Sequence, residues 1–162
     1  MPPQGRRAHA LCTAALVAVA LASSCRAPAR AAAPSPGGAP ELEALCRSQQ
    51  SAWNRGELET FMALGYWRSG ELTFFSGGEW TRGYAPMLER FRTRYESGEG
   101  EMGELAFREL ESARLGRDHG LVRGRWKLVF GDGQELGGLF TLLLRRFPEG
   151  WRIVHDHTSV DA

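Results

Sequence analysis

Cysteine and lysine are scarce in this chain, and none of its apolar runs is long. Among 162 residues there are three cysteines, and only Cys46 lies beyond residue 40. A disulfide framework and a cysteine-based metal site are therefore excluded, and Cys46 is expected to be a small buried apolar residue. The longest apolar stretch, residues 8–22, is about fifteen residues long, whereas a membrane-spanning helix needs about 20. We therefore expect no transmembrane helix.

Acidic residues are absent from the first forty positions, where four arginines lie: Arg6, Arg7, Arg26 and Arg30. The remainder holds all 19 acidic residues but only 16 of the 20 basic ones, which gives it a formal charge of −3. Only one of these is a lysine, Lys127, which indicates a compositional bias toward arginine. A mildly acidic domain without a basic stripe argues against nucleic acid or an anionic lipid surface as its main partner.

The N-terminal segment has the pattern of an export signal. Arg6 and Arg7 precede the apolar residues 8–22, as the basic and apolar regions of a signal peptide do. An adjacent pair of arginines does not by itself select the twin-arginine route. We expect a signal peptide over residues 1–24, which would place the protein in the periplasm or cell envelope.

Two processing sites are compatible with this signal. Residues 21–25, which end in Cys25, resemble a bacterial lipobox, although Ala22 stands where a branched aliphatic residue is usual. Cleavage there would leave Cys25 lipidated and the protein attached to a membrane. The alternative is an ordinary cut at a small-x-small site such as residues 29–31. Residues 25–40, rich in Ala, Pro and Gly, are expected to form a flexible linker in either case.

Residues 41–160 are expected to form one α+β domain. Apolar spacings of three and four predict a helix over residues 41–55, a second from residue 57 and a third that starts near Pro86. A tight hairpin is predicted over residues 72–82. Four longer runs separated by short turns predict an antiparallel meander, which the three helices can cover; these runs are residues 105–115, 119–130, 136–147 and 151–159.

Three segments resemble the nuclear transport factor 2-like (NTF2-like) superfamily. They are residues 51–58, 81–84 and 150–159. The last is similar to SnoaL-like and ketosteroid-isomerase-homologue proteins of unassigned function, and to the association domain of calmodulin-dependent kinase. The resemblance implies a cone-shaped fold in which a curved antiparallel sheet packs against three N-terminal helices and leaves a pocket at its open end. Members include isomerases, dehydratases, transport factors and assembly modules, so the fold alone does not select the function.

The last predicted strand carries two candidate catalytic residues, His155 and His157. Side chains alternate along a strand, so both should share a face with Trp151 and Ile153 and point into the cone or its mouth. There they could transfer protons or bind an anion; the alternative is a structural or interface role. By the same alternation, Asp156 is expected on the opposite face. No third ligand accompanies the two histidines, so no metal is predicted, and no cofactor.

Aromatic residues with a polar end are candidates for the pocket wall. We expect Trp53, Tyr66 and Tyr84 there, because such rings combine apolar area with a hydrogen-bonding group. Arg82 could pair with an anionic ligand beside them. His157 is the fifth residue that we expect to line the pocket. The expected ligand is a small apolar or anionic molecule.

Three functions remain open at this level. The first is a small-molecule-binding domain, dimeric through the outer face of its sheet, and the absence of a recognisable catalytic set favours it. The second is a cofactor-independent isomerase or dehydratase that uses His155 or His157 for proton transfer. The third is a structural oligomerisation module whose pocket is filled by side chains.

Overall fold

The computed structural model describes residues 38–96 and 102–161. The predicted signal peptide, most of the linker and Cys25 lie outside these residues. None of the helices among the described residues is long and apolar enough to cross a membrane.

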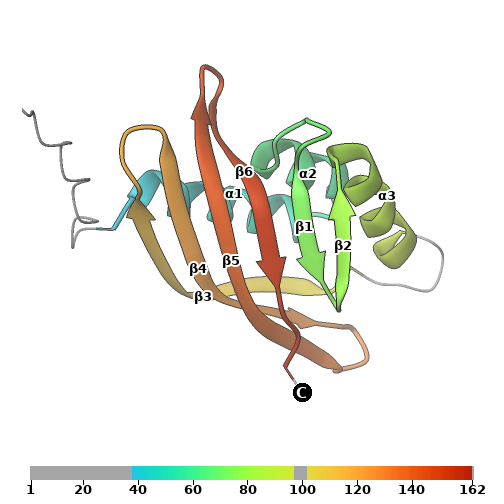
Figure 1. Ribbon diagram of the computed structural model, residues 1–162. Coiled ribbons are helices and arrows are strands. Elements are labelled where there is room, and N and C mark those ends of the chain that lie inside the picture. The colour runs from blue at the N-terminus through green and yellow to red at the C-terminus, as the bar shows by residue number, and fades with distance from the viewer. Residues whose placement is uncertain (1–37, 97–101, 162) are drawn as a thin grey trace, which may run out of the picture. The chain divides into compact units, whose positions relative to one another are not determined.

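The domain has the predicted order of two helices, a short hairpin, a third helix and a long meander (Figure 1). The fold is therefore α+β, as expected. The helices are α1 (Pro40–Trp53), α2 (Leu58–Gly65) and α3 (Tyr84–Tyr95). The strands are β1 (Thr73–Ser76), β2 (Glu79–Arg82), β3 (Glu104–Arg114), β4 (His119–Val129), β5 (Glu135–Phe147) and β6 (Gly150–Thr158).

The six strands form one curved sheet in the order β2-β1-β6-β5-β4-β3 (Figure 1). Every pair of neighbours is antiparallel except β1 and β6, which are parallel. The short hairpin thus extends the meander beyond β6, a pairing between segments about eighty residues apart in sequence that local patterns do not predict. It places β1 next to the strand that carries His155 and His157.

The core lies between the helices and the sheet. Its fully buried side chains include Leu42, Leu58, Met62, Leu144 and Ile153, spaced along the elements as an amphipathic helix or a half-buried strand requires. Cys46 is also fully buried, as expected. Burial raises the pKa of its thiol to about 12, so the thiol stays neutral at physiological pH.

Polar side chains of α1 and of Asn54, the residue that follows it, attach this helix to the free edge of β3. The amide of Asn54 donates to the Leu105 carbonyl at 2.9 Å and accepts from the Leu105 N–H at 2.7 Å. One helical turn earlier, the Gln50 amide oxygen accepts from the Phe107 N–H at 2.7 Å. Edge strands leave such backbone groups unpaired, and here the helix satisfies them.

A bulge in β6 reverses the alternation of its side chains. Ile153 pairs with Leu144 of β5, but His155 pairs with the next residue, Leu143, so Val154 is an extra residue on β6. Beyond such a bulge each side chain lies on the face opposite to the one that unbroken alternation predicts. The expected inward placement of His155 and His157, and the outward placement of Asp156, are therefore wrong.

Candidate functional site

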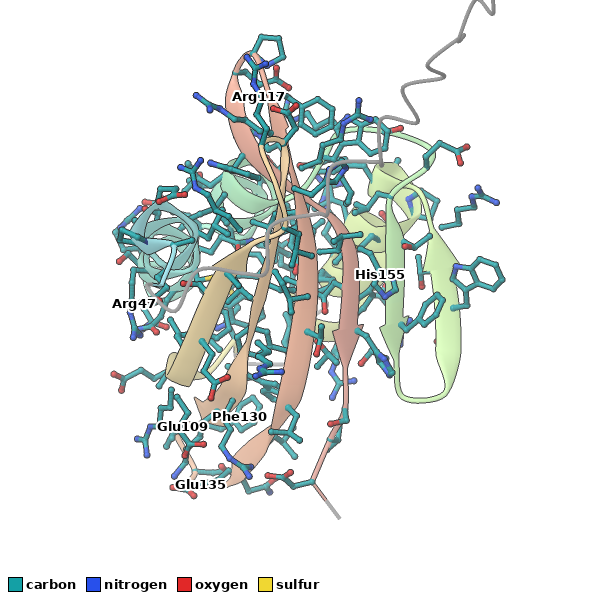
Figure 2. All side chains as sticks on the ribbon, turned by 60° about the vertical axis from the view of Figure 1, so that its left-hand side comes forward. Arg47, Glu109, Arg117, Phe130, Glu135 and His155 are labelled. Carbon is teal, nitrogen blue, oxygen red and sulfur yellow. The ribbon has the colours of Figure 1, made fainter. Side chains whose placement is uncertain are left out.

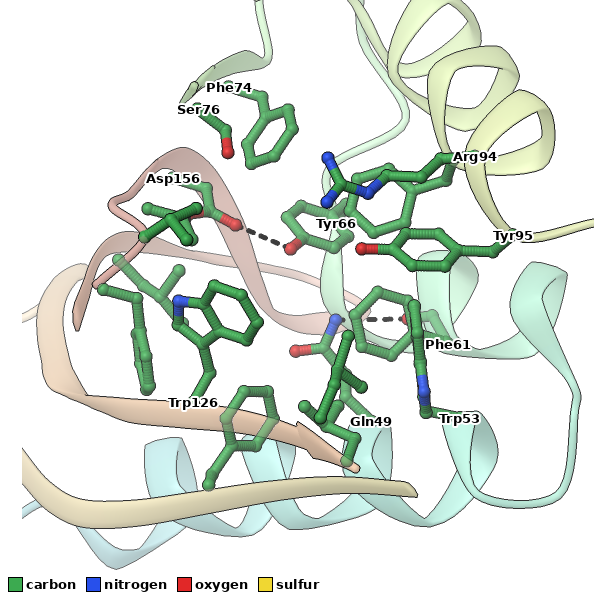
Figure 3. A pocket seen from close by; sticks show the side chains of 18 residues that line it. Gln49, Trp53, Phe61, Tyr66, Phe74, Ser76, Arg94, Tyr95, Trp126 and Asp156 are labelled. Atoms are coloured by element: carbon green, nitrogen blue, oxygen red, sulfur yellow. Dashed lines mark hydrogen bonds between the residues drawn. The ribbon is translucent and has the colours of Figure 1, made fainter. Parts of the chain in front are cut away.

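A cavity of about 110 Å³ lies between the helices and the inner face of the sheet (Figure 3). Nine of its 18 lining residues are aromatic, and some of these rings pack edge to face, among them Trp53 with Phe61 and Tyr95. Trp126 of β4 faces them from the sheet. The exposed side chains of Arg94 and Val160 also line the cavity, so it opens to solvent beside them.

Asp156 is the carboxyl group of this cavity. It is 4% exposed, and its neighbours across the inner face, Leu142 of β5 and Phe74 of β1, are apolar. The Tyr66 hydroxyl donates to its Oδ2 atom and the Thr158 hydroxyl donates to its Oδ1 atom, both at 2.7 Å. A buried carboxyl needs such partners.

Burial raises the pKa of Asp156 from 3.8 to about 6, although the hydrogen bonds from Tyr66 and Thr158 lower it. The desolvation of the anion thus outweighs the two donors that stabilise it. Burial, and secondarily the charge of Asp156, raises the pKa of Tyr66 well above its usual value, so the phenol stays protonated. The site therefore holds one carboxyl group that exchanges its proton near neutral pH and one permanent hydroxyl donor.

Gln49 of α1 provides a further polar group. Its Nε2 atom donates to the Phe61 carbonyl at 3.2 Å, and its amide oxygen faces the interior of the cavity in Figure 3. The side chain fits because α2 has Gly65 opposite it: a Cβ atom at that position would overlap the Gln49 amide. The amide oxygen is thus an acceptor for a ligand donor.

Among the described residues that line the cavity, Arg94 of α3 is the only cationic side chain and Asp156 is the only acidic one. The guanidinium of Arg94 lies over the ring of Tyr95, 5.5 Å from its centroid. In Figure 3 it projects from α3 toward the side of the pocket where Tyr66 and Asp156 meet. The cavity wall therefore combines a positive group at the opening with a buried acidic group.

The structure brings together two of the five residues expected at the pocket wall. Trp53 and Tyr66 line the cavity, whereas Arg82, Tyr84 and His157 do not. Arg82 is exposed and forms an ion pair with Glu71 at 2.5 Å. Tyr84 lies at the start of α3 under Arg68. The position of Tyr84 follows from the docking of α3, which turns its C-terminal half, not its N-terminus, toward the cavity. Arg82 is the last residue of β2, outside this helix.

His155 and His157 lie on the outer face of the sheet. The Nδ1 atom of His155 is 2.7 Å from the hydroxyl oxygen of Thr73, and Figure 2 shows His155 beside β1. Both rings contact the ring of Phe75 edge to face. Partial burial, and secondarily His157, lowers the pKa of His155. The pair is therefore a surface cluster outside the cavity.

Asp156, Arg94 and Gln49 were not expected at the site. Asp156 was assigned to the wrong face because the bulge at Val154 has no signature in residue types. Arg94 and Gln49 each lie on an amphipathic helix, where a polar residue next to the apolar stripe is ordinarily solvated. Only the docked positions of α1 and α3 show that these two side chains reach the cavity.

No set of three or more His, Cys, Asp or Glu side chains within residues 38–96 and 102–161 is arranged to hold a metal ion. The polar groups at the cavity are one carboxyl, two tyrosine hydroxyls, an amide and a guanidinium, with smaller hydroxyls at its edge. Such a set can bind an organic molecule through hydrogen bonds and transfer a proton at Asp156.

Comparison with known proteins identifies solved structures that are similar to this chain. An NTF-2 like protein of unknown function from Shewanella oneidensis shares 33% identity; the match covers 74% of this chain and 97% of that one, with a TM-score of 0.68. A ketosteroid isomerase-like protein from Erwinia carotovora atroseptica is 19% identical over 76% of this chain and 95% of its own, with a TM-score of 0.61. An NTF2-like protein of unknown function from Pseudomonas putida is 17% identical over 76% and 89%, with a TM-score of 0.62.

No family model matches the sequence, and no curated protein matches it. At less than 25% identity, the Erwinia and Pseudomonas proteins show the fold alone. The protein from Shewanella has a higher identity and is covered almost completely.

Proposed function

The chain belongs to the nuclear transport factor 2-like family, and we propose that its domain binds a small, largely apolar molecule in the cavity through a hydrogen bond to Asp156. The observation that carries the proposal is a buried carboxyl group, held by Tyr66 and Thr158, in the wall of a cavity lined mainly by aromatic and aliphatic side chains. Ligand pockets commonly combine apolar walls with a few such convergent polar groups. A module used only for assembly needs no such cavity.

The size of the cavity limits the ligand. Its volume is about 110 Å³, and an engineered apolar cavity of roughly 150 Å³ holds benzene. The cavity is smaller than that, so the ligand body is at most about one ring or a short branched chain, with its polar end extending toward the opening. The hydroxyl of Tyr95 is a further partner for that end, and the buried amide of Gln49 is a partner for a group deeper in the cavity.

Filling the cavity tests this proposal. Leu142 lines it, so Leu142→Phe should place a ring in the space that the ligand needs. Leu139→Phe is the matched control, because Leu139 lies on the same strand and is 50% exposed. The full-length chain would be titrated by NMR with neutral ring compounds such as benzamide and benzyl alcohol.

We expect chemical shifts of cavity residues to move in the native protein and in Leu139→Phe, and binding to weaken in Leu142→Phe at least about tenfold, because overpacking leaves no room for the probe. The circular dichroism spectrum of each variant controls for folding. If no neutral probe moves the cavity resonances of the native protein, the domain does not bind small molecules there.

A second candidate function is an acid-base enzyme of the isomerase or dehydratase type. The observation that favours it is that Asp156, with a pKa of about 6, can both accept and donate a proton near neutral pH. Tyr66, not a histidine, would be its hydrogen-bonding partner. In this version the proton carrier is Asp156 in place of His155 or His157, which lie outside the cavity.

Exchange of the α-protons of cyclohexanone in D₂O, followed by NMR, tests this second function. Asp156→Asn should reduce protein-catalysed exchange about a hundredfold or more, whereas His155→Gln and His157→Gln should leave it unchanged. Loss of exchange in a histidine variant, with exchange retained in Asp156→Asn, would show that Asp156 is not the proton carrier.

The proposed location is the cell envelope. Its support is the sequence of residues 1–24, with Arg6 and Arg7 before an apolar stretch, and the lipobox-like segment that ends at Cys25. Labelling of expressing bacteria with radioactive palmitate tests the lipid anchor. Label on the protein that disappears in Cys25→Ser is the expected result, and a protein released unlabelled by osmotic shock would favour the alternative cleavage at residues 29–31.

A homodimer through the outer face of the sheet is also proposed. Its support is that this face exposes Leu139 beside the cluster of Phe75, His155 and His157. Sedimentation of the full-length chain measures its mass directly. Leu139→Glu should shift a dimer toward the monomer, since burying an unpaired carboxylate at an interface is costly.

A further inference from the structure

Arg94 differs from the arginines around it. Two residues earlier on α3, Arg92 pairs with Glu59, and on β2 Arg82 pairs with Glu71. Arg94 has no carboxylate within ion-pair distance among the described residues; its guanidinium contacts the side chain of Tyr95. It is thus a pocket arginine whose planar group of donors is available to a ligand.

The surroundings of Arg94 suit a carboxylate. A guanidinium presents its N–H groups in a fixed fork that matches the two oxygens of a carboxylate. The ring of Tyr95 supports the guanidinium from one side, and Phe74 and Phe91 belong to the apolar wall of the same cavity. A ligand whose carboxylate meets Arg94 can therefore place an apolar body against these rings.

We propose that the ligand of the cavity is a small monocarboxylate, with its carboxylate on Arg94 at the opening and an apolar body of about one ring among the aromatic side chains. This inference rests on the proposed binding function and names the class of its ligand. The sequence suggested Arg82 for this role; the structure places Arg94 at the cavity instead.

Asp156 makes this binding depend on pH. An ionised Asp156 repels a carboxylate in the same cavity, whereas a protonated one is neutral and can donate a hydrogen bond to it. The groups that face Asp156 in the cavity are the hydroxyls of Tyr66 and Thr158, and Arg94 lies elsewhere in the same wall. His157 points away from it on the outer face of the sheet, and its charge lowers the pKa of Asp156. Cys46 of α1 lies behind it, and burial raises the pKa of this thiol to about 12. Asp156 is therefore the cavity group that changes charge near pH 6.

Benzoate and benzamide form a pair of probes that differ in charge but hardly in shape. Both would be titrated by NMR into the full-length chain at pH 5 and pH 8. We expect benzoate to bind more tightly than benzamide at pH 5, and to weaken about fivefold or more at pH 8 as Asp156 ionises. The affinity for benzamide should change little over this range.

Substitutions show which residues cause the preference for benzoate and its pH dependence. Arg94→Gln should weaken the affinity for benzoate about tenfold and leave the affinity for benzamide unchanged. Arg92→Gln removes the same charge from the same helix and should alter neither affinity. Asp156→Asn should abolish the pH dependence of benzoate binding, whereas His157→Gln should retain it.

Two results would overturn the carboxylate proposal and leave the binding function standing. The first is that the native protein binds both probes with equal affinity. The second is that Arg92→Gln weakens benzoate binding as much as Arg94→Gln does. Failure of both probes to bind would contradict the binding function itself. Tight benzoate binding that does not depend on Arg94 would place the carboxylate elsewhere and also overturn the proposal.

Discussion

The two halves of β6 contribute differently to the molecule. Residues 150–153 pack against the closed part of the core, where Ile153 is fully buried against Leu144. Residues 155–158 border the cavity, where the inward side chains are Asp156 and Thr158. One strand thus supplies apolar packing and a titratable site within nine residues. The extra residue at Val154 separates the two and decides which side chains enter the cavity.

The largest expected difference between the two halves is in stability. Ile153→Ala should lower the free energy of unfolding by about 2–5 kcal/mol, because it leaves a void in the closed core. His157→Ala, on the outer face, should change it by about 0.5 kcal/mol or less. Urea denaturation measures both values. A loss at His157 as large as the loss at Ile153 would mean that the strand alternates without a bulge.

The pH dependence of stability sharpens the same comparison. The folded state holds the proton of Asp156 more tightly than the unfolded chain, because burial raises its pKa from 3.8 to about 6. Its contribution to stability is therefore most favourable below about pH 4, decreases as the pH rises to about 6, and then stays constant. Asp156→Asn removes this decrease. Relative to the native protein, the variant should gain up to about 3 kcal/mol between pH 4 and pH 7.

Urea denaturation of both proteins at these two pH values is the measurement. His157→Asn is the matched control, and it should retain the native dependence on pH. An unchanged difference between Asp156→Asn and the native protein across this range would show that Asp156 titrates at its ordinary pKa, and hence that it is solvated.

The hydrogen bond between Tyr66 and Asp156 on the inner face is expected to make the next largest contribution to the free energy of unfolding. Tyr66→Phe should cost about 1–3 kcal/mol at pH 7, where the hydroxyl donates to an ionised and buried carboxylate. It should also raise the pKa of Asp156 further, since a donor that stabilises the anion is lost. Tyr84→Phe, outside the cavity, is the control. Equal effects of the two substitutions on the pH profile would contradict the placement of Tyr66.

The hydrogen bond on the outer face should have the smallest effect. Thr73→Val removes the contact with His155 and should cost about 0.5–1.5 kcal/mol, without altering the pH dependence that belongs to Asp156. Denaturation at pH 4 and pH 7 tests this as well. If Thr73→Val changed the pH dependence of stability more than Tyr66→Phe did, the titrating group would be His155.

Most of the fold could be predicted from local patterns. The apolar spacings of α1 and α2 predicted both helices, although α1 ends at Trp53, two residues before the predicted end. Gly77 and Gly78 have φ values of 61° and 78°, which only a few residue types adopt readily, so the hairpin was also visible in the sequence. The parallel pairing of β1 with β6 was not, because it joins segments far apart in the chain.

The candidate site could be predicted only in part. Trp53 and Tyr66 were expected at the pocket because large rings with a polar end are used there, and both line it. The prediction placed His157 and Asp156 on the wrong faces of the sheet, because it assumed that side chains alternate along β6 without a bulge. Arg94 is one of several arginines on α3, and its spacing does not distinguish it from Arg92, which pairs with Glu59 on the surface.

The sequence by itself determined the order and type of the elements, the burial of Cys46 and the family, because these depend on apolar periodicity, turn residues and short motifs. The tertiary structure decided which polar groups share the cavity. A single extra residue at Val154 turns Asp156 inward and the histidines outward, and the docking of α3 brings Arg94 to the opening. Both depend on how distant segments pack, since the energy of a buried polar group is set by its neighbours in space rather than in sequence.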